Sequence, residues 1–445
     1  MKRIYLDYAA TTLVDKRVKR AMEPYFFEKF GNPSSLHFLG QEAVAVVDRS
    51  RETIVKAINA DFREIIFTGS ATEANNLALR GVFKALIQNS KIKNQNDNSK
   101  FKIPRLIVSA IEHESVLETA RDLENEGVEV IYLPVDDSGF VDLKKLKNSL
   151  NENTILVSIM YANNEIGIIQ PIKEIATTIK DFRKEKNFPL FHTDAVQAFQ
   201  YLDCDIDNLG VDPVTHPDGR YGVDMMTLSA HKIYGPKGIG ALYARTINSK
   251  QLTIDKVNHG QMSNVRSQLL SPLVTGGGQE FGLRSGTENV PAIVGFAKAV
   301  EYASNSRELE HKRVRELRDY FWQELKKIYP DAKINGIEQI ANSKEQRVND
   351  SPFAIRYLPN ILNIYFPGHL AEDLLIKLDM AGIAVSSGSA CAVRSAKLSH
   401  VLEALGFSEE RIRSSIRFSF GRFTTKKELD EVIKRMRNMA KSKYA

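Results

Sequence analysis

The stretch REIIFTGSATEANNLALRGVFKAL, residues 63–86, predicts the fold class of this chain. Arg63–Phe67 is a short apolar run typical of a buried strand, and Thr68-Gly69-Ser70 ends it with a turn. Apolar residues then recur at helical spacing through Thr72–Leu86. A strand that leads through a tight turn into a helix is the repeating unit of α/β proteins.

The same alternation continues over the first two thirds of the chain. Helical patterns such as Gln41–Ile58 and Ile172–Glu185 lie between apolar runs that carry few polar residues. Such runs are typical of strands buried on both faces, so we expect a mainly parallel seven-stranded sheet sandwiched by helices. The seventh strand could form a hairpin with the sixth. The expected strands are residues 63–67, 105–109, 128–133, 154–160, 189–192, 225–229 and 238–243.

A smaller α+β domain is expected after the sheet. Helical patterns cover Pro291–Ala303 and Glu308–Ile328, and strand patterns follow at 360–366, 383–386 and 415–419. We expect a large domain at 15–275 and a small domain built from 1–14 and 276–445. Three polar stretches, at 88–100, 212–221 and 341–352, have the composition of surface loops.

Composition narrows the class of protein. The 445 residues carry a net charge of +6, from 61 basic and 55 acidic side chains, which is a mild excess. We interpret it as a solvated surface and expect no direct contact with nucleic acid. Only two cysteines are present, so a disulfide framework is excluded and a cytoplasmic protein is expected. Neither a signal peptide nor a membrane span is indicated.

Candidate site residues follow the expected strands at their carboxyl ends, where α/β sheets bind ligands. Gly69–Glu73 opens a helix whose first free amides suit a phosphate, although an ordinary helix cap has the same pattern. Asp194 ends a buried strand, either as a helix cap or as the partner of a cationic ring nitrogen. Lys232 follows another buried strand, where a lysine can form a Schiff base with an aldehyde cofactor. Lys237, in a Gly-Pro-Lys-Gly turn, is the more exposed lysine.

Ser229–Gly238, which is SAHKIYGPKG, resembles the cofactor-lysine motif of the cysteine desulfurases. These are pyridoxal-phosphate enzymes of fold type I, in the class V aminotransferase branch. The resemblance extends from Tyr5 to about Arg435 and is to the nitrogen-fixation and iron–sulfur-cluster type with a long catalytic-cysteine loop. Further matching segments are Tyr5–Thr12, Gly31–Ser34, Glu112-His113, Asn163–Gly167, Arg284–Thr287, Ser386–Cys391 and Ser414–Thr425.

The resemblance implies a pyridoxal 5'-phosphate site. Lys232 would hold the cofactor, His113 would stack on its ring and move protons, and Asp194 would pair with the ring nitrogen. Gln197 would bond the phenolic oxygen. His113 could instead be a surface residue. The remaining cofactor contacts implied are Ala71, Thr72, Ser229 and His231 at the phosphate, Asn164 at the cofactor, and Thr287 at the phosphate of a second subunit, which implies a homodimer.

The substrate side of the site follows from the same resemblance. Arg417 and Asn164 would bind the carboxylate of L-cysteine, with Asn32 nearby, although Arg417 could instead belong to a structural ion pair. Cys391 lies in a run of small polar residues and would take the sulfur as a persulfide. Cys204 stands between two acids, which oppose a thiolate, so we expect it to be structural. No metal site is expected.

The expected function is a cysteine desulfurase, a sulfurtransferase that converts L-cysteine to L-alanine. Its sulfur would pass to an acceptor protein, for iron–sulfur cluster assembly or transfer-RNA thiolation. Three alternatives remain: a selenocysteine lyase-like enzyme, another class V aminotransferase, and a non-catalytic sulfur-relay scaffold. The chain also lacks the longer tail by which housekeeping members grip the scaffold protein, so the identity of the acceptor stays open.

Overall fold

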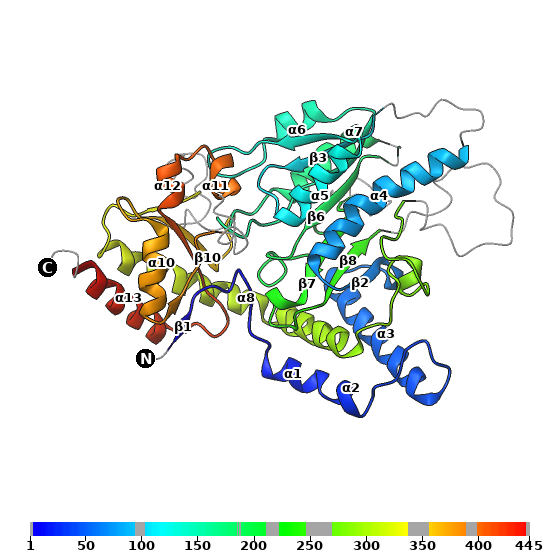
Figure 1. Ribbon diagram of the computed structural model, residues 1–445, viewed down its shortest axis with the longest axis horizontal. Coiled ribbons are helices and arrows are strands. Elements are labelled where there is room, and N and C mark those ends of the chain that lie inside the picture. Colours follow the sequence, from blue (N-terminus) through cyan, green and yellow to red (C-terminus); the bar gives the residue numbers. More distant parts are fainter. Residues whose placement is uncertain are drawn as a thin grey trace.

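The structure is a computed structural model, and it describes residues 3–93, 103–184, 186, 188–210, 222–245, 269–336, 356–388 and 398–441. These residues form a seven-stranded sheet, a three-stranded sheet and a two-stranded sheet. Figure 1 shows helices on both faces of the large sheet, with the smaller sheets, α10 and α13 gathered at the other end of the molecule. The expected α/β fold class is therefore confirmed.

In chain order, the helices and strands are β1 (Ile4–Tyr5), α1 (Lys16–Met22), α2 (Pro24–Phe27), α3 (Phe38–Ile58), η1 (Phe62–Glu64), β2 (Ile65–Thr68), α4 (Ala71–Lys93), β3 (Arg105–Ser109), α5 (Glu114–Asn125), β4 (Glu129–Leu133), α6 (Leu143–Ser149), β5 (Thr154–Ser158), α7 (Ile172–Arg183), β6 (Leu190–Asp194), β7 (Met225–Ser229), η2 (Ala230–Lys232), β8 (Gly240–Ala244), η5 (Glu280–Gly282), α8 (Val290–Lys326), β9 (Lys333–Ile334), β10 (Ile361–Tyr365), α10 (Ala371–Met380), β11 (Ile383–Ala384), α11 (His400–Ala404), α12 (Glu409–Arg413), β12 (Ser415–Ser419) and α13 (Lys426–Lys441).

The large sheet has the strand order β2-β8-β7-β6-β5-β3-β4. β8 is antiparallel to both of its neighbours, and the other neighbouring strands run parallel. β8 thus forms the hairpin with β7 that the sequence suggested. Since β2 and β7 are both antiparallel to β8, six strands direct their carboxyl ends to one edge, and β8 starts there at Gly240. That edge is where a ligand site is expected.

Side-chain alternation along the buried strands divides the core into two layers. In β3, Leu106 and Val108 pack with α4 and α5, whereas Ile107 faces the layer formed by α3, α7 and α8. Successive strand residues point to opposite faces, so a strand buried on both faces needs an apolar residue at nearly every position. This requirement produces the continuous apolar runs seen in the sequence.

The smaller sheets place β12, which carries Arg417, beside the large sheet. β10 is the centre of an antiparallel three-stranded sheet, and its Asn363 pairs with Arg417. β1 pairs in parallel with β11, through Tyr5 and Ala384, so the start of the chain lies with its last third. This pairing is consistent with the assignment of residues 1–14 to the small domain, but the domain limits stay a prediction.

Two sequence-based boundaries were wrong. α8 is one helix, whereas we expected a break between Ala303 and Glu308. The intervening segment has low helix propensity but contains no Gly or Pro, and Ser306 Oγ donates to Tyr302 O at 2.7 Å within the helix. α4 reaches Lys93, so 88–93 is helical and not a loop. The remainder of that stretch, and the stretches at 212–221 and 341–352, lie outside the described residues.

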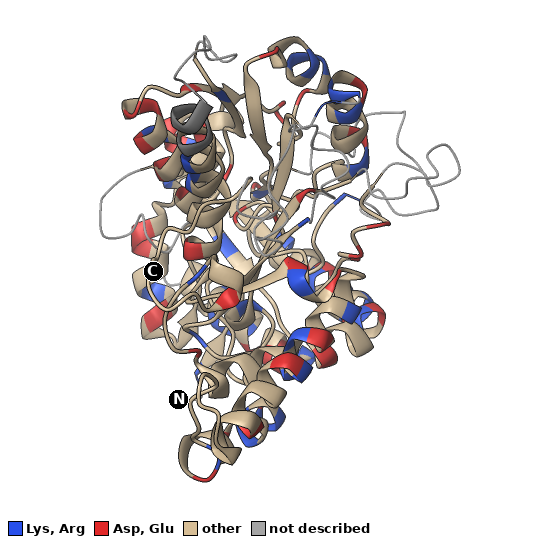
Figure 2. Ribbon diagram, turned by 90° about the vertical axis from the view of Figure 1, so that its right-hand side faces the viewer, with Lys and Arg blue, Asp and Glu red and all other residues tan. Residues whose placement is uncertain are grey.

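Charges are mixed over the surface. Figure 2 shows basic and acidic residues interspersed along the helices, as expected for a solvated surface. Among the helices that the structure describes, none has an apolar stretch of the length a bilayer crossing requires.

Candidate active site

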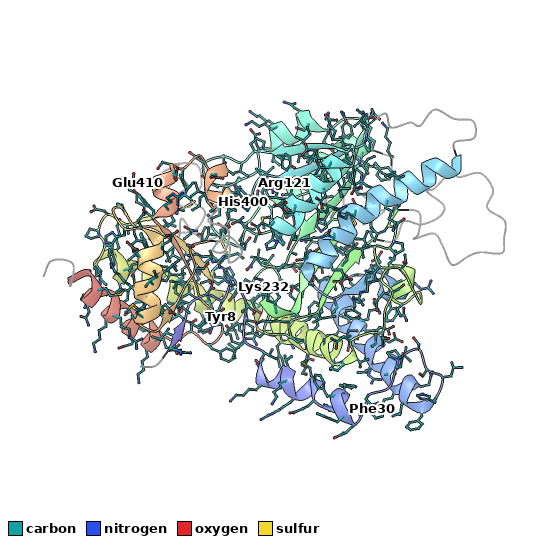
Figure 3. All side chains as sticks on the ribbon, viewed as in Figure 1. Tyr8, Phe30, Arg121, Lys232, His400 and Glu410 are labelled. Carbon is teal, nitrogen blue, oxygen red and sulfur yellow. The ribbon has the colours of Figure 1, made fainter. Side chains whose placement is uncertain are left out.

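A cavity of about 250 Å³ lies at the carboxyl edge of the large sheet and contains most of the predicted site. Lys232, labelled in Figure 3, lies near the middle of the molecule, between the large sheet and the smaller ones. Of the predicted residues, the cavity is lined by Ala71, Thr72, His113, Asn164, Asp194, Gln197, His231, Lys232 and Arg417. It is also lined by Ala9, Ala10, Ser70, Ser115, Met160 and Val196.

The first turn of α4 forms one wall of the cavity. Ser70 Oγ accepts from Glu73 N at 3.1 Å, and Gly69 N donates to Glu73 Oε2 at 2.8 Å, so the ordinary helix cap is present. The amides of Ala71 and Thr72 have no acceptor within the helix, because the first turn of any helix lacks one. Both interpretations of the sequence therefore hold together: a capped helix start presents an anion-binding edge to the cavity.

Lys232 ends the short helix η2, directly after β7. Its Nζ donates to Ala9 O at 2.6 Å and to Ala10 O at 2.7 Å. Gln197 Nε2 donates to the same Ala9 oxygen at 3.0 Å. The loop before α1 thus holds the ammonium group at the cavity through neutral carbonyl oxygens.

Asp194 is the last residue of β6 and is only 6% exposed. Its Oδ2 accepts from Asn75 Nδ2 at 2.8 Å, and its Oδ1 accepts from Val196 N at 2.9 Å. Asn75 also donates to Ser115 Oγ at 2.8 Å. Burial of an ionised carboxylate is costly without a compensating cation. The donors to Asp194 are neutral, which leaves its charge available to a cationic ligand group.

Burial also determines the charge of the two cavity histidines. His113 is solvent-exposed and lines the cavity, but the protein packed around its ring still desolvates it and lowers its pKa, with Asp194 opposing and Lys232 reinforcing the change. Its Nδ1 accepts from Ser115 N at 3.1 Å, so in the neutral ring the proton is on Nε2. Burial, followed by the charge of Lys232, lowers the pKa of His231 to about 4. Both rings are therefore neutral at pH 7.

Arg417 fits both alternatives that the sequence left open. It is 1% exposed, and its Nη2 pairs with Asp7 Oδ1 at 2.9 Å. Its Nη1 donates to Asn164 O at 2.9 Å. The buried Nε has no hydrogen-bond partner among the described residues, and the side chain lines the cavity. Within the described part of the chain, Arg417 is thus an ion-pair residue that still has one donor without an acceptor.

Three predicted residues do not line the cavity, and a fourth is outside the part of the chain that the structure describes. Ser229 is buried at the end of β7 but does not line the cavity. Thr287 is exposed in the loop before α8. Asn32 is exposed in the loop between α2 and α3, close to Phe30, which Figure 3 shows far from Lys232. Cys391 lies outside the described residues.

Cys204, the other cysteine of the chain, is a poor nucleophile. Cys204 is completely buried, and burial raises the pKa of its thiol to about 12, with a smaller contribution from Asp203. The flanking acids were expected to suppress the thiolate, but burial is the larger cause of the raised pKa. A thiol with so high a pKa carries almost no thiolate at neutral pH and is a poor nucleophile.

Sequence analysis missed several residues that support the site. Asp7 holds Arg417, Asn75 holds Asp194, and Thr11 Oγ1 lies 3.1 Å from His231 Nδ1. Asn75 could have been found, because it follows Thr72 by three positions and so lies on the same face of α4. Asp7 carries no comparable local signal, since 410 positions separate it from Arg417.

Comparison with known proteins now gives this arrangement a family. The class-V aminotransferase family matches residues 4–217 and 218–432. The chain belongs to the class-V aminotransferase family. Within it, cysteine desulfurase IscS of Dictyoglomus turgidum is 42% identical over 97% of this chain and 93% of its own. Putative cysteine desulfurase IscS 1 of Bacillus subtilis is 40% identical over 99% of both chains. The chain is therefore an enzyme of the cysteine desulfurase group.

Solved structures agree with this assignment. A NifS-like protein, 32% identical, aligns with a TM-score of 0.78 over 99% of this chain and 100% of its own. The structure of SspA in complex with cysteine, also 32% identical, aligns with a TM-score of 0.71 over 95% of this chain and 100% of its own. The resemblance inferred from the motifs is confirmed.

The cofactor of class-V aminotransferases is pyridoxal 5'-phosphate, and the cavity residues fit it. The fit rests on three groups: free helix amides for an anion, a buried carboxylate with neutral donors for a ring cation, and a primary amine for an aldehyde. These groups meet in one cavity, which is what a compact aromatic phosphate with an aldehyde requires.

Proposed function

We propose that this enzyme converts L-cysteine to L-alanine and transfers the sulfur atom to Cys391 as a persulfide. The observation that carries the proposal is the meeting of the Lys232 amine and the buried Asp194 carboxylate in one cavity. The desulfurase relatives and the SspA structure with cysteine support the choice of substrate. The reaction balances without an oxidant, because L-cysteine and the Cys391 thiol together give L-alanine and a Cys391 persulfide.

The cofactor would be held by residues on several elements. Lys232 would bind the aldehyde carbon, Asp194 the ring nitrogen and Gln197 the phenolic oxygen. When bound, the cofactor supplies an electron sink for the substrate carbon next to the amino group. The phosphate would be held by Ala71 N, Thr72 and His231, with Ser229 and the Thr287 of a second subunit.

Substrate would be oriented by Arg417 and Asn164, with Asn32 nearby. The Arg417 side chain lines the cavity, so its guanidinium group would donate to a substrate carboxylate bound there. The bond from Arg417 to Asn164 O fixes these two groups relative to each other. Positioned in this way, the sulfur atom would face the thiol that receives it.

Proton movement would be shared between Lys232 and His113. Lys232 Nζ would take the proton from the substrate carbon next to the amino group and return a proton to the product. His113, neutral with its proton on Nε2, would donate or accept at that atom while Ser115 N holds Nδ1. A pKa lowered below 6.5 keeps this histidine neutral at pH 7.

The chain would act as a homodimer that passes sulfur to an acceptor protein, for iron–sulfur cluster assembly or transfer-RNA thiolation. Thr287 and Asn32 are exposed away from their own cavity, as residues that complete a partner's cavity would be. Large apolar side chains surround Asn32 at the surface, and a second copy would cover them. They are Phe26, Phe27, Phe30, Leu36 and Phe38. A thiol that must stay reduced suits the cytoplasm.

The test measures alanine and sulfide from L-cysteine, with added pyridoxal phosphate and dithiothreitol, for wild type, Cys391→Ala and Cys204→Ala. Wild type is expected to release both products in equal amounts. Cys391→Ala should keep its cofactor absorbance near 420 nm and form no persulfide, whereas the control Cys204→Ala should retain activity.

Full activity of Cys391→Ala would remove Cys391 as the sulfur acceptor and favour a lyase-like reaction. Amino-group exchange with a keto acid, in place of alanine release from cysteine, would indicate an ordinary aminotransferase. Absence of a borohydride-sensitive absorbance band would favour the non-catalytic scaffold.

A further inference from the structure

Glu165 is a buried acid whose role neither the motifs nor the cavity explains. It is 1% exposed and directly follows Asn164, one of the proposed substrate residues. Its amide nitrogen donates to Asn163 Oδ1 at 2.8 Å, which fixes the backbone of this turn. Its Oε2 accepts from Ser399 Oγ at 2.5 Å, a contact that spans 234 positions. The carboxylate therefore reaches away from the large sheet toward the small domain.

The same oxygen occupies the space beside Gly388 that a side chain there would need. A Cβ placed on Gly388 would lie 2.9 Å from Glu165 Oε2 and 3.8 Å from Ser399 Cβ. The φ of Gly388 is +131°, so a side chain there would be strained as well as blocked. Gly388 and Ser399 are therefore neighbours in space, and the Glu165 carboxylate lies against both. In the sequence these two residues bracket the stretch that contains Cys391.

The residues next to Gly388 and Ser399 are bonded to the site as well. Ser386 and Arg417 exchange two backbone hydrogen bonds, at 3.2 and 2.6 Å. His400 Nε2 lies 2.9 Å from Glu112 O, the carbonyl group that precedes His113. The segments before and after the Cys391 stretch are thus bonded to Arg417, Glu112 and Glu165. Arg417 is a proposed site residue, and the other two are sequence neighbours of His113 and Asn164.

We propose that Glu165 is a positioning residue for sulfur transfer, because it holds Ser399 beside Gly388 and so fixes the spacing of the two residues that bracket the Cys391 stretch in the sequence. The inference rests on the proposed function, since it concerns the step in which the Cys391 thiol meets the substrate sulfur. The carboxylate does not touch the reacting atoms. It acts through Ser399, whose hydroxyl donates to Glu165 and accepts from Leu402 N at 3.2 Å, at the start of α11.

The experiment compares Ser399→Ala, Glu165→Gln and the double variant with wild type, all as holoenzymes. The matched control is Ser408→Ala. Ser408 is the N-cap of α12, as Ser399 is of α11, but Ser408 makes no contact with Glu165 among the hydrogen bonds of the described residues. Two rates are measured in single turnovers with L-cysteine. One is the change in cofactor absorbance after mixing, and the other is persulfide on Cys391, followed by alkylation and mass spectrometry.

We expect Ser399→Ala to slow persulfide formation on the order of tenfold. Displacement of a reacting group from its productive position by less than about 1 Å has effects of this size. The cofactor absorbance change and the KM for L-cysteine should stay within about twofold of wild type. The double variant should be no slower than the slower single variant, since both changes remove one contact. Ser408→Ala should transfer sulfur at the wild-type rate.

A readout without substrate separates positioning from general damage. At a temperature where all variants are folded, the rate at which iodoacetamide alkylates Cys391 should change in Ser399→Ala and Glu165→Gln and not in Ser408→Ala. Ser399→Ala should also lose more thermal stability than Ser408→Ala, because Ser399 is buried against Glu165 whereas Ser408 is exposed. Wild-type persulfide rates in all variants would overturn the role of Glu165 and leave the proposed function intact. A wild-type enzyme that forms no persulfide on Cys391 would instead overturn the proposed function. Equal slowing of both rates would show that Glu165 is merely structural.

Discussion

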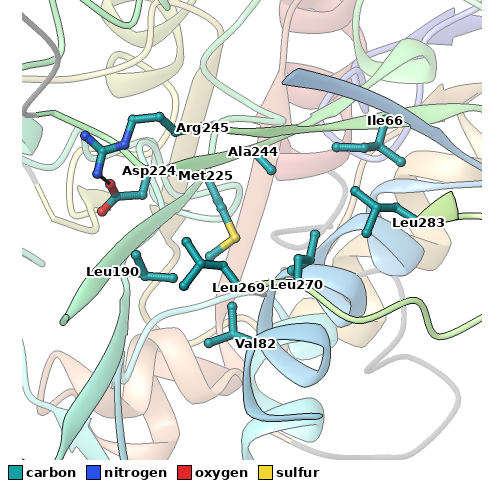
Figure 4. Close-up of a pocket in the computed structure, with 10 residues that line it drawn as sticks. All are labelled: Ile66, Val82, Leu190, Asp224, Met225, Ala244, Arg245, Leu269, Leu270 and Leu283. Atoms are coloured by element: carbon teal, nitrogen blue, oxygen red, sulfur yellow. Dashed lines mark ion pairs between the residues drawn. The ribbon is translucent and has the colours of Figure 1, made fainter. Parts of the chain in front are cut away.

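Two cavities lie against the large sheet, and they differ in the groups that hydrogen-bond or pair with their buried acid. The larger, of about 250 Å³, is at the carboxyl edge and holds Lys232 and Asp194. The smaller, of about 40 Å³, lies where β7 begins, and Figure 4 shows Asp224 and Arg245 at its margin. Its remaining lining is almost wholly apolar: Ile66, Val82, Leu190, Met225, Ala244, Leu269, Leu270 and Leu283.

The difference lies in what compensates each acid. Asp224 Oδ2 accepts from Arg183 Nη1 at 2.8 Å, and its Oδ1 lies 2.5 Å from Arg245 Nη2. Burial alone would raise the pKa of Asp224, but the two guanidinium charges lower it below its ordinary value. Asp194 is held by the neutral donors Asn75 and Val196. An acid compensated by cations of its own chain stabilises the fold, whereas an acid held by neutral donors has charge left for a ligand.

The largest expected effect comes from removal of the cavity amine. Lys232→Ala should lower L-cysteine turnover by at least about 10³-fold, because the proposed covalent attachment of the cofactor requires this amine. The borohydride-sensitive absorbance band should also disappear. Lys237→Ala, a lysine five positions further on and exposed, is the control and should keep both properties. Retention of the band in Lys232→Ala would place the cofactor on a different residue and remove the basis of the contrast between the cavities.

The next prediction applies one change to the two acids. Asp194→Asn should lower turnover by about 10²-fold with little loss of stability, since it removes a charge meant for the ligand. Asp224→Asn should leave turnover per folded molecule unchanged. It should lower the free energy of unfolding by about 3–5 kcal/mol, because it leaves two arginines without their buried partner. Urea unfolding and the turnover assay, performed on both variants, measure the two effects separately.

Either of two outcomes would contradict this contrast between the acids. If Asp194→Asn unfolds as readily as Asp224→Asn, neutral donors do not distinguish a ligand-binding acid from a structural one. If Asp224→Asn loses turnover while remaining folded, the smaller cavity is connected to the active site through the sheet.

Much of the sheet and of the cavity at its carboxyl edge could be predicted from the sequence, because both depend on patterns within short segments. Buried strands require unbroken apolar runs, so all seven strands and the hairpin of β8 were predicted. Polar residues that follow such strands meet at one edge, which predicted Asp194 and Lys232. The sequence predicted that Arg417 either binds a carboxylate or belongs to an ion pair. It did not predict that the ion-pair partner is Asp7.

What the sequence could not predict depends on distant partners. The contacts of Glu165 with Ser399 and of Asp7 with Arg417 join positions hundreds of residues apart, and no periodicity reports them. Thr287, predicted to reach the phosphate of a second subunit, and Asn32, predicted near the substrate, both lie outside the cavity of their own chain. A single chain cannot bring them there, so their roles depend on the proposed dimer. The break expected in α8 failed because composition alone underestimates a helix that packs along its whole length.

The smallest expected effect concerns His192, which lies inside the sheet, two positions before Asp194 on β6. It is completely buried, with Ser158 Oγ 2.8 Å from Nδ1 and Thr227 Oγ1 3.0 Å from Nε2. Burial lowers its pKa to about 3. A histidine in the unfolded chain has a pKa of about 6.5, so both states are neutral above that pH and the full stability is present.

As the pH falls below about 6.5, the unfolded chain binds a proton at this position that the folded chain refuses. The free energy of unfolding should therefore decrease by about 1.4 kcal/mol per pH unit from this residue alone, or about 2 kcal/mol between pH 7 and pH 5. Urea unfolding of wild type and His192→Gln at both pH values measures it. The variant is less stable at pH 7, so the informative quantity is the decrease on acidification, which should be smaller in the variant. Equal decreases in the free energy of unfolding would mean that His192 binds a proton in the folded protein as it does in the unfolded chain. In that case, neutral partners inside this sheet would be sufficient to stabilise a buried charge.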